Sequence, residues 1–270
     1  MRFSPRANAL WLAGSVLFAA AVAGCNGPPP TSAPTPTAAA PQPARDRLAG
    51  LAAAAQGDAY VATYTLTTSG RGDRTVTVAI GTDGSWVVAL PATALSGLAD
   101  IAMFRSKDGE FQCVLGRAEG TEGQRADLGP LNPGCAKVTA LTAAVDPRVQ
   151  HIFTDWLPAL TDRATALAVS SVPPPSGATG NCFSVQSTSA ALAPPVDPGT
   201  YCFAADGVLT GATVGFGTLQ LVSPVAAAPP SVAIPAPVVN RAPLPMVAPP
   251  APPPPPTATP TPSNSASPRT

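Results

Sequence analysis

Proline is concentrated in two stretches of the chain, residues 28–43 and 224–268, and this distribution limits where a folded domain can form. The 270 residues contain 36 prolines, whereas an average usage of about 5% would give roughly a third of that number. Stretches of Pro, Ala, Ser and Thr with almost no charge bury too little apolar surface to fold by themselves. The region between them, residues 45–222, is long enough for one domain with a hydrophobic core.

The first 24 residues are typical of a signal peptide. Arg2 and Arg6 precede an apolar run over residues 9–24, which is shorter than the roughly twenty residues that a membrane-spanning helix needs. A polar, Pro-rich stretch follows immediately. We therefore expect export of the chain, followed by removal of residues 1–24.

The residues at the end of that run, Val22-Ala23-Gly24-Cys25, resemble the bacterial lipobox. This resemblance implies that cleavage leaves Cys25 as the first residue, with a diacylglyceryl group on its sulfur. Because two or three acyl chains such as palmitate bind a membrane durably, whereas one binds only marginally, Cys25 would anchor the protein to the extracytoplasmic face of the cell membrane. The alternative is an ordinary signal peptide, cleaved near Ala23, that releases a soluble protein.

Charge and motifs argue against several functional classes. Fifteen basic residues balance fifteen acidic ones, so the sequence lacks the basic surface that nucleic acids require. It contains no Gly-x-Ser-x-Gly, no phosphate-binding Gly-Lys-Thr and no His-Glu-x-x-His, so we expect neither an enzyme nor a bound cofactor or metal. Arg71-Gly72-Asp73 spells the integrin-binding tripeptide, but Gly and Asp are also common in hairpin turns, and we favour a turn.

Four cysteines follow Cys25, namely Cys113, Cys135, Cys182 and Cys202. An even number of cysteines in an exported chain predicts two disulfides, which can be connected in three ways. We favour Cys113 with Cys135 and Cys182 with Cys202, because each pair is close in sequence. A metal site is less favoured, since no pair has two-residue spacing and the chain has a single histidine.

The hydrophobic pattern of the central region predicts a short helix over residues 45–56 and then mainly antiparallel strands. Apolar and polar residues alternate with a period of two, and signals such as Asp83-Gly84 and Asp206-Gly207 predict hairpin turns. A Gly-rich polar loop ends at Cys135. The predicted strands are residues 60–67, 76–80, 86–90, 101–105, 110–115, 166–172, 182–187, 200–204, 208–214 and 216–222.

A second helix is predicted after Asp146, with a capping carboxylate and then Pro147 at the first helical position. Pro158 should kink or end this helix. His151 lies off the apolar stripe, so we expect it to face solvent. The stripe itself consists of Val149, Ile152, Phe153, Trp156, Leu157 and Leu160.

The order of these elements resembles the lipoprotein-carrier superfold, most visibly in residues 199–203 followed by residues 206–209. The resemblance implies an α+β fold, mainly antiparallel β, in which a strongly curved sheet forms an open half-barrel and an amphipathic helix plugs its concave side. In mycobacterial-type envelope lipoproteins of this fold, acyl chains occupy the space between sheet and helices. Two disulfides and a long Pro-rich tail depart from the bacterial carriers.

This resemblance leads to a first hypothesis, that a helix across a concave sheet leaves an apolar cavity of about 300 Å³ or more for a lipid or another apolar ligand. The same side chains could equally form a filled core. The residues expected to line such a cavity are Tyr64, Leu66, Val78, Trp86, Val88, Ile152, Phe153 and Trp156.

The alternative hypothesis is a structural or protein-interaction module of the cell envelope, whose Pro-rich tail reaches a cell-wall or protein partner. Both hypotheses divide the chain in the same way. The predicted parts are a signal peptide (residues 1–24), the lipidated cysteine with a Pro-rich tether (25–44), a β-rich domain (45–222) and a disordered Pro- and Ala-rich tail (223–270).

Overall fold

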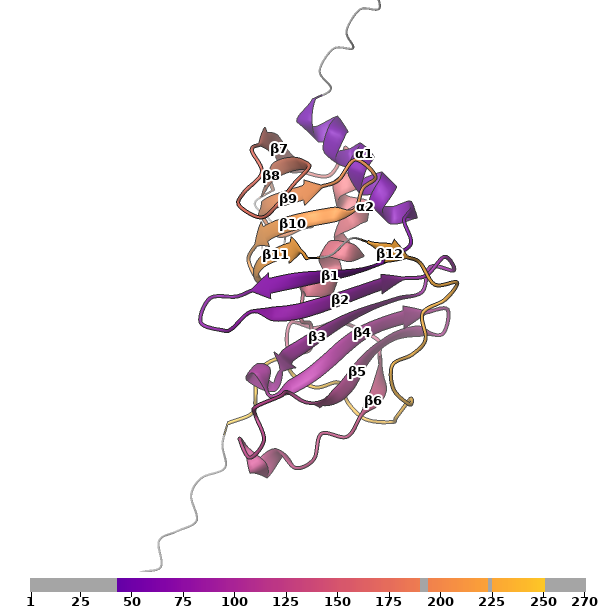
Figure 1. Cartoon of the computed structure of the whole chain (residues 1–270), viewed down its shortest axis with the longest axis vertical. Helices are drawn as coiled ribbons and strands as arrows, with labels where there is room; N and C mark the ends of the chain where they lie inside the picture. Colours follow the sequence, from indigo (N-terminus) through magenta and orange to yellow (C-terminus); the bar gives the residue numbers. More distant parts are fainter. Residues whose placement is uncertain (1–42, 190–193, 223–224, 251–270) are drawn as a thin grey trace, which may run out of the picture. The chain divides into compact units, whose positions relative to one another are not determined.

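The computed structural model describes residues 43–189, 194–222 and 225–250, and Cys25 with the predicted signal peptide lies outside them. Twelve strands form one antiparallel sheet in the order β6-β5-β4-β3-β2-β1-β11-β10-β9-β8-β7, and β12 also pairs with β1 (Figure 1). The strands are β1 (Tyr60–Thr67), β2 (Arg74–Ile80), β3 (Trp86–Ala94), β4 (Ala99–Ser106), β5 (Gly109–Arg117), β6 (Gly134–Val138), β7 (Leu167–Val172), β8 (Asn181–Ser187), β9 (Gly199–Phe203), β10 (Leu209–Val214), β11 (Gly217–Leu221) and β12 (Ala226–Ala227).

Two meanders, β1–β6 and β7–β11, lie side by side and join where β1 pairs with β11. The consecutive strands β6 and β7 therefore lie at opposite edges of the sheet, which is not closed. The segment between them has to cross a face of the sheet, and it carries the 3₁₀ helix η3 (Val149–Phe153) and α2 (Trp156–Thr161). The N-terminal helix α1 (Ala44–Gly57) packs against α2 (Figure 1).

The predicted mainly antiparallel β fold is confirmed. The strands expected in the two meanders are present, with ends that differ by a few residues. Sequence reasoning missed β6, because its five residues include Gly134 and offer too short an alternation to distinguish a strand from a loop. It also missed β12 and the short 3₁₀ helices η1 (Leu95–Gly97) and η2 (Ala126–Leu128).

The second predicted helix differs from the expectation in both its start and its continuity. Asp146 is not its N-cap, because η3 begins only at Val149 and Arg148 occupies the N-cap position. The Asp146 Oδ1 instead accepts a hydrogen bond from the Arg148 backbone N–H (2.9 Å) before the helix begins. The helical segment then breaks at Thr154, whose φ of −133° and ψ of −94° are non-helical. Pro158 consequently lies in the first turn of α2, where its missing N–H sacrifices no helical hydrogen bond.

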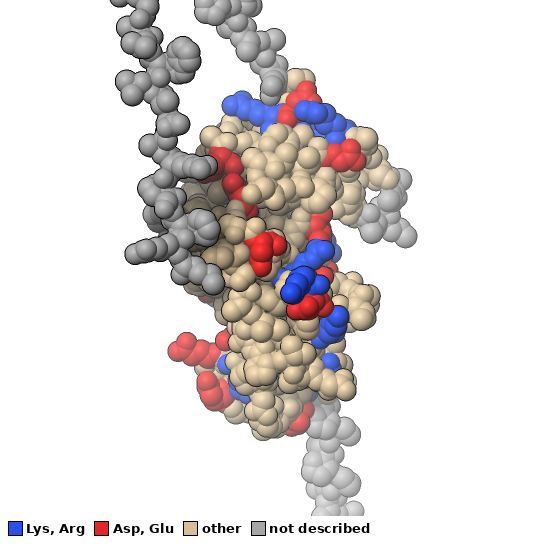
Figure 2. All heavy atoms as spheres, turned by 90° about the vertical axis from the view of Figure 1, so that its right-hand side faces the viewer, with Lys and Arg blue, Asp and Glu red and all other residues tan. Residues whose placement is uncertain are grey.

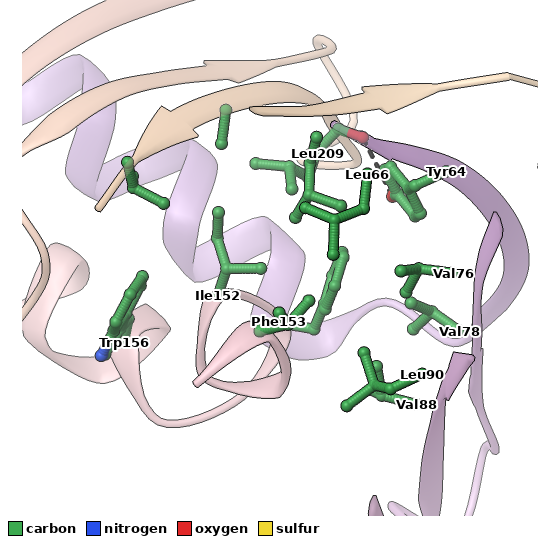
Figure 3. Close-up of a cluster of buried hydrophobic side chains, with 14 of the residues drawn as sticks. Tyr64, Leu66, Val76, Val78, Val88, Leu90, Ile152, Phe153, Trp156 and Leu209 are labelled. Atoms are coloured by element: carbon green, nitrogen blue, oxygen red, sulfur yellow. Dashed lines mark hydrogen bonds between the residues drawn. The ribbon is translucent and has the colours of Figure 1, made fainter. Parts of the chain in front are cut away.

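The core lies between the helices and one face of the sheet (Figure 3). Side chains on β1 alternate between buried and partly exposed, so that Tyr64 and Leu66 point to the same face. The Tyr64 hydroxyl donates to the Leu209 carbonyl (3.0 Å), which satisfies the polar end of a fully buried ring. Arg45 Nη1 donates to the Leu160 carbonyl (3.0 Å) and so links α1 to the last turn of α2.

Both predicted disulfides are present, Cys113–Cys135 and Cys182–Cys202. In each pair the two cysteines occupy directly opposite positions on neighbouring antiparallel strands, β5 with β6 and β8 with β9. One disulfide therefore links the edge strand β6 to β5. The other links β8, the neighbour of the edge strand β7, to β9. Two disulfides are consistent with an extracytoplasmic protein.

The prediction of a disordered tail from residue 223 is wrong for residues 225–250, which we call the C-terminal strap. The strap runs from β12 past β5 and β6 (Figure 1). It covers the free edge of β6, where the Cys135 N–H donates to the Pro237 carbonyl (2.8 Å) and the Val239 N–H donates to the Cys135 carbonyl (2.9 Å). Residues 251–270 lie outside the described part of the chain.

The strap passes from one face of the sheet to the other. Ala236 packs with Phe104 and Phe111 in a small second core on the face opposite the helices, whereas Leu244 and Met246 pack against the main core. A proline residue has no backbone N–H, but its carbonyl oxygen accepts hydrogen bonds. The Pro-rich strap can therefore bind the sheet region by accepting hydrogen bonds from backbone N–H groups there. The prolines whose carbonyls accept such bonds are Pro229, Pro230, Pro237 and Pro245.

Candidate functional site

All eight of the side chains expected to line a cavity are packed together in the main core. The rings of Tyr64 and Phe153 lie 5.0 Å apart, and the Trp156 ring meets the Tyr201 ring edge-on at 6.3 Å. The space between Trp156 and the sheet is thus occupied by aromatic rings. The expected lining residues that are buried in this core are Tyr64, Leu66, Val78, Trp86, Val88, Ile152, Phe153 and Trp156.

Two of these residues, Trp86 and Phe153, also line a pocket of about 250 Å³ at one end of the strands, which we call the mouth pocket. It lies where the C-terminal end of α1, the link between η3 and α2, and the β2–β3 turn meet. Its apolar wall includes Ile80, Trp86, Phe153 and Leu157, and the last three of these side chains are buried.

The rim of the mouth pocket is polar and charged, with Asp58, Arg105 and Asp155 at its opening. Burial and the nearby charge of Asp206 raise the pKa of the Asp58 carboxyl. On the face shown in Figure 2, acidic and basic side chains are interspersed and most of the surface is uncharged. The pocket therefore offers an apolar interior beneath a rim that carries charges of both signs.

His151 is not a solvent-facing residue, contrary to the prediction. Its side chain is only 16% exposed, its Nε2 lies 2.9 Å from Asp146 Oδ2, and its Nδ1 lies 2.9 Å from Asp155 Oδ2. The ring also stacks on Trp156, with centroids 5.9 Å apart. Asp155 follows His151 by four residues, a spacing that brings two side chains together on one face of a helical segment, and Asp146 precedes the histidine by five residues.

The two carboxylates favour the charged imidazolium. Burial of the ring lowers the His151 pKa, but the hydrogen bonds to Asp146 and Asp155 and their negative charges outweigh burial and raise it from 6.5 to about 9. Glu110 lies in the same electrostatic cluster, where burial and the charge of Asp155 raise its carboxyl pKa. A histidine held protonated in this way is a poor general base near neutral pH.

The Arg71-Gly72-Asp73 tripeptide forms part of the β1–β2 turn, as expected. Arg71 Nη1 donates to the Ala92 carbonyl (3.3 Å), and the Thr67 hydroxyl donates to Asp73 Oδ1 (2.7 Å). Both charged side chains of the tripeptide are therefore engaged within the domain.

The described residues contain no group of three or more His, Cys, Asp or Glu side chains placed to hold a metal ion. Within the same residue ranges, no helix is long and apolar enough to span a membrane.

Two sequence comparisons bear on the identity of the chain. No protein-family model matches it, and no curated protein matches its sequence. The case for a function therefore depends on the geometry of the domain and on the sequence of its N-terminus.

Proposed function

We propose that the chain is a lipoprotein anchored through Cys25 to the extracytoplasmic face of the membrane, and that its domain binds the apolar part of an amphiphilic ligand in the mouth pocket. The role is one of binding and not of catalysis. The observation that carries the proposal is an apolar pocket wall, formed by Trp86, Phe153 and Leu157, below a charged rim. Binding sites for small molecules are typically apolar inside, with a few polar groups that orient the ligand.

The size of the pocket limits what it can hold. Its volume of about 250 Å³ is slightly below the range of about 300–1,000 Å³ that is usual for drug-sized ligands. The pocket therefore suits the end of an acyl chain or a single ring, with the remainder of the ligand outside. Arg105 at the rim could pair with an anionic group on that remainder, such as a carboxylate.

The proposal retains the half-barrel hypothesis in an altered form. The sheet is open and the helices cover one of its faces, as in a plugged half-barrel. However, the ligand would enter at the end of the strands, beside Trp86, because aromatic rings occupy the space between Trp156 and the sheet.

Tryptophan fluorescence tests ligand binding directly. Trp11 lies in the predicted signal peptide, so the mature chain has two tryptophans, Trp86 and Trp156. In a mature Cys25→Ala protein that also carries Trp156→Phe, only Trp86 contributes tryptophan fluorescence. A brominated fatty acid, whose bromine quenches a neighbouring indole, should reduce this fluorescence in a saturable way.

A matched pair of variants identifies the pocket. Ile80→Glu places a carboxylate in the pocket wall and should abolish quenching of Trp86, whereas Thr75→Glu places one at an exposed position of the same strand and should leave quenching unchanged. Saturable quenching that survives Ile80→Glu, or no saturable quenching at all, would contradict the proposal.

The anchor is tested by cell fractionation. The wild-type protein should sediment with membranes and carry acyl chains on Cys25 in its intact mass. The Cys25→Ala variant should lack them and remain in the soluble fraction. Membrane association that is unchanged in this variant would rule out the lipid anchor while leaving the fluorescence test unaffected.

A further inference from the structure

Two arginine side chains converge at the end of the strands opposite the mouth pocket. Arg71 lies in the β1–β2 turn and Arg74 is the first residue of β2. Their Nη1 atoms lie 3.3 Å and 3.2 Å from the same acceptor, the Ala92 carbonyl oxygen at the far end of β3. Because the two guanidinium groups share one acceptor, their positive charges are held next to each other.

Neither arginine forms an ion pair with a described residue. The nearby Asp73 accepts a hydrogen bond from Thr67 instead. The Nη atoms of Arg74 bond only to neutral oxygens, those of Thr68, Ala92 and Thr93, and its buried Nε has no described partner. Burial and the charge of Arg71 lower the Arg74 pKa, as expected for like charges in contact.

The backbone beside this arginine pair is strained. Ala92, Leu95 and Ser96 have φ values of 46°, 55° and 62°, a region that residues other than glycine rarely occupy. Strain of this kind persists only where the surroundings impose it, and it concentrates at ligand sites. The C-terminal strap holds two of these three residues, since the Leu95 and Ser96 N–H groups donate to the Pro245 and Met246 carbonyls (2.9 and 2.7 Å).

Glycine at position 97 keeps space free beside the arginine pair. Its φ is +100°, and a Cβ there would lie 3.5 Å from Arg71 Nη1, in contact with the guanidinium. The space belongs to a pocket of about 410 Å³, whose polar lining consists of both arginines, Asp73, Ser96, Thr121 and Gln124.

We propose that this pocket, the arginine-pair pocket, binds the phosphate group of a phosphate ester. A phosphate monoester carries up to two negative charges and several acceptor oxygens, so one group can neutralise both guanidiniums, whereas a carboxylate can neutralise only one. The pocket is larger than a phosphate ion, which leaves space for the esterified organic group. The phosphate can belong to a free small molecule or to a phospholipid headgroup. The proposal does not rest on ligand binding in the mouth pocket.

Calorimetry on the mature Cys25→Ala chain tests the arginine-pair pocket, with inorganic phosphate, glycerol 3-phosphate and acetate as probes. Vesicles of phosphatidylcholine, with and without phosphatidic acid, whose headgroup is a phosphate monoester, are tested in parallel by sedimentation. Glycerol 3-phosphate should bind more tightly than phosphate if the source is a free ester. Sedimentation only with vesicles that contain phosphatidic acid would assign the site to a lipid headgroup.

Arg71→Gln should weaken binding by about tenfold to a hundredfold, since it removes charged donors to the phosphate. Arg71→Lys keeps the charge but loses the planar guanidinium, which can donate two parallel hydrogen bonds to a phosphate, and should weaken binding less than Arg71→Gln does. Arg47→Gln makes the same change at an exposed position on α1 and should have no effect. Thermal unfolding without ligand verifies that each variant is folded. Binding to none of the phosphate probes, equally tight binding of acetate, or equal losses in Arg71→Gln and Arg47→Gln would overturn the proposal.

Discussion

At the scale of single residues, His151 shows how two flanking carboxylates change the chemistry of a side chain. The hydrophobic pattern places it on the solvent side of a helix, but its imidazole contacts Asp155, four residues later, as well as Asp146, five residues earlier. The charged ring lies between two carboxylates, and its contact with Asp155, the N-cap residue of α2, links η3 to that helix. This arrangement makes the stability of the domain dependent on pH.

The sign of this dependence follows from the raised pKa. A histidine pKa that rises from 6.5 in the unfolded chain to about 9 in the folded one contributes stability that is complete below pH 6.5 and is lost as the pH rises through about 9. The contribution is at most about 3 kcal/mol, from about 1.4 kcal/mol per pKa unit. Urea unfolding measured between pH 6 and pH 9.5, chosen to bracket about 6.5 and 9, should show this decline.

His151→Gln is the control for that measurement. His151 is the only histidine in the chain, so the variant should be less stable than the wild type at pH 6 and should lose most of the decline toward alkaline pH. A wild-type free energy of unfolding that is constant over this range would mean that the two carboxylates do not hold the imidazolium as described.

At the scale of secondary-structure elements, the disulfides hold strands near both edges of the sheet. β6 has five residues and pairs in register with β5 alone, so few strand contacts hold it. Cys113–Cys135 joins these two strands directly, and Cys182–Cys202 does the same for β8 and β9. The sequence separations, 22 and 20 residues, are nearly equal.

Because the loops are similar in length, the chain-entropy model predicts that loss of either disulfide costs about 3 kcal/mol of unfolding free energy. Paired Cys→Ala variants, Cys113→Ala with Cys135→Ala and Cys182→Ala with Cys202→Ala, should therefore have similar urea midpoints. A much larger loss for the first pair would indicate that β6 depends on its disulfide more than on the strap that covers its edge.

At the scale of the whole domain, the C-terminal strap stabilises the meander β1–β6 from outside the sheet. It covers Phe104 and Phe111 on one face, pairs with the edge of β6, and returns to the main core, where Gln112 Nε2 donates to the Leu244 carbonyl (3.0 Å) and the Leu244 N–H donates to Gln112 Oε1 (2.6 Å). The strap also holds the strained segment next to the arginine-pair pocket.

Removal of the strap should therefore destabilise the domain. A chain that ends at Val222 re-exposes Phe104 and Phe111 and should lose about 3 kcal/mol or more, which lowers Tm by roughly 6–12 °C. A chain that ends at Pro250 keeps every contact of the strap described above and serves as the control. Equal Tm values for the two truncated proteins would show that the strap contributes no stability.

What the sequence by itself determined is local in nature. Strand alternation, hairpin turns and the pairing of nearby cysteines were predicted correctly because each depends on residues close together in the chain. Export and lipidation at Cys25 remain predictions from the N-terminal sequence.

Tertiary structure alone decided three features: the pairing of β1 with β11, the packing of the strap, and the positions of the two pockets. Each brings together residues far apart in the chain, as when Gln112 bonds Leu244 or Phe153 lies beside Trp86 in the mouth pocket. Hydrophobic periodicity shows which face of an element is buried but not which distant segment covers it. A Pro-rich segment, which cannot build a core of its own, could be recognised as part of the domain only once the sheet edge that it covers was known.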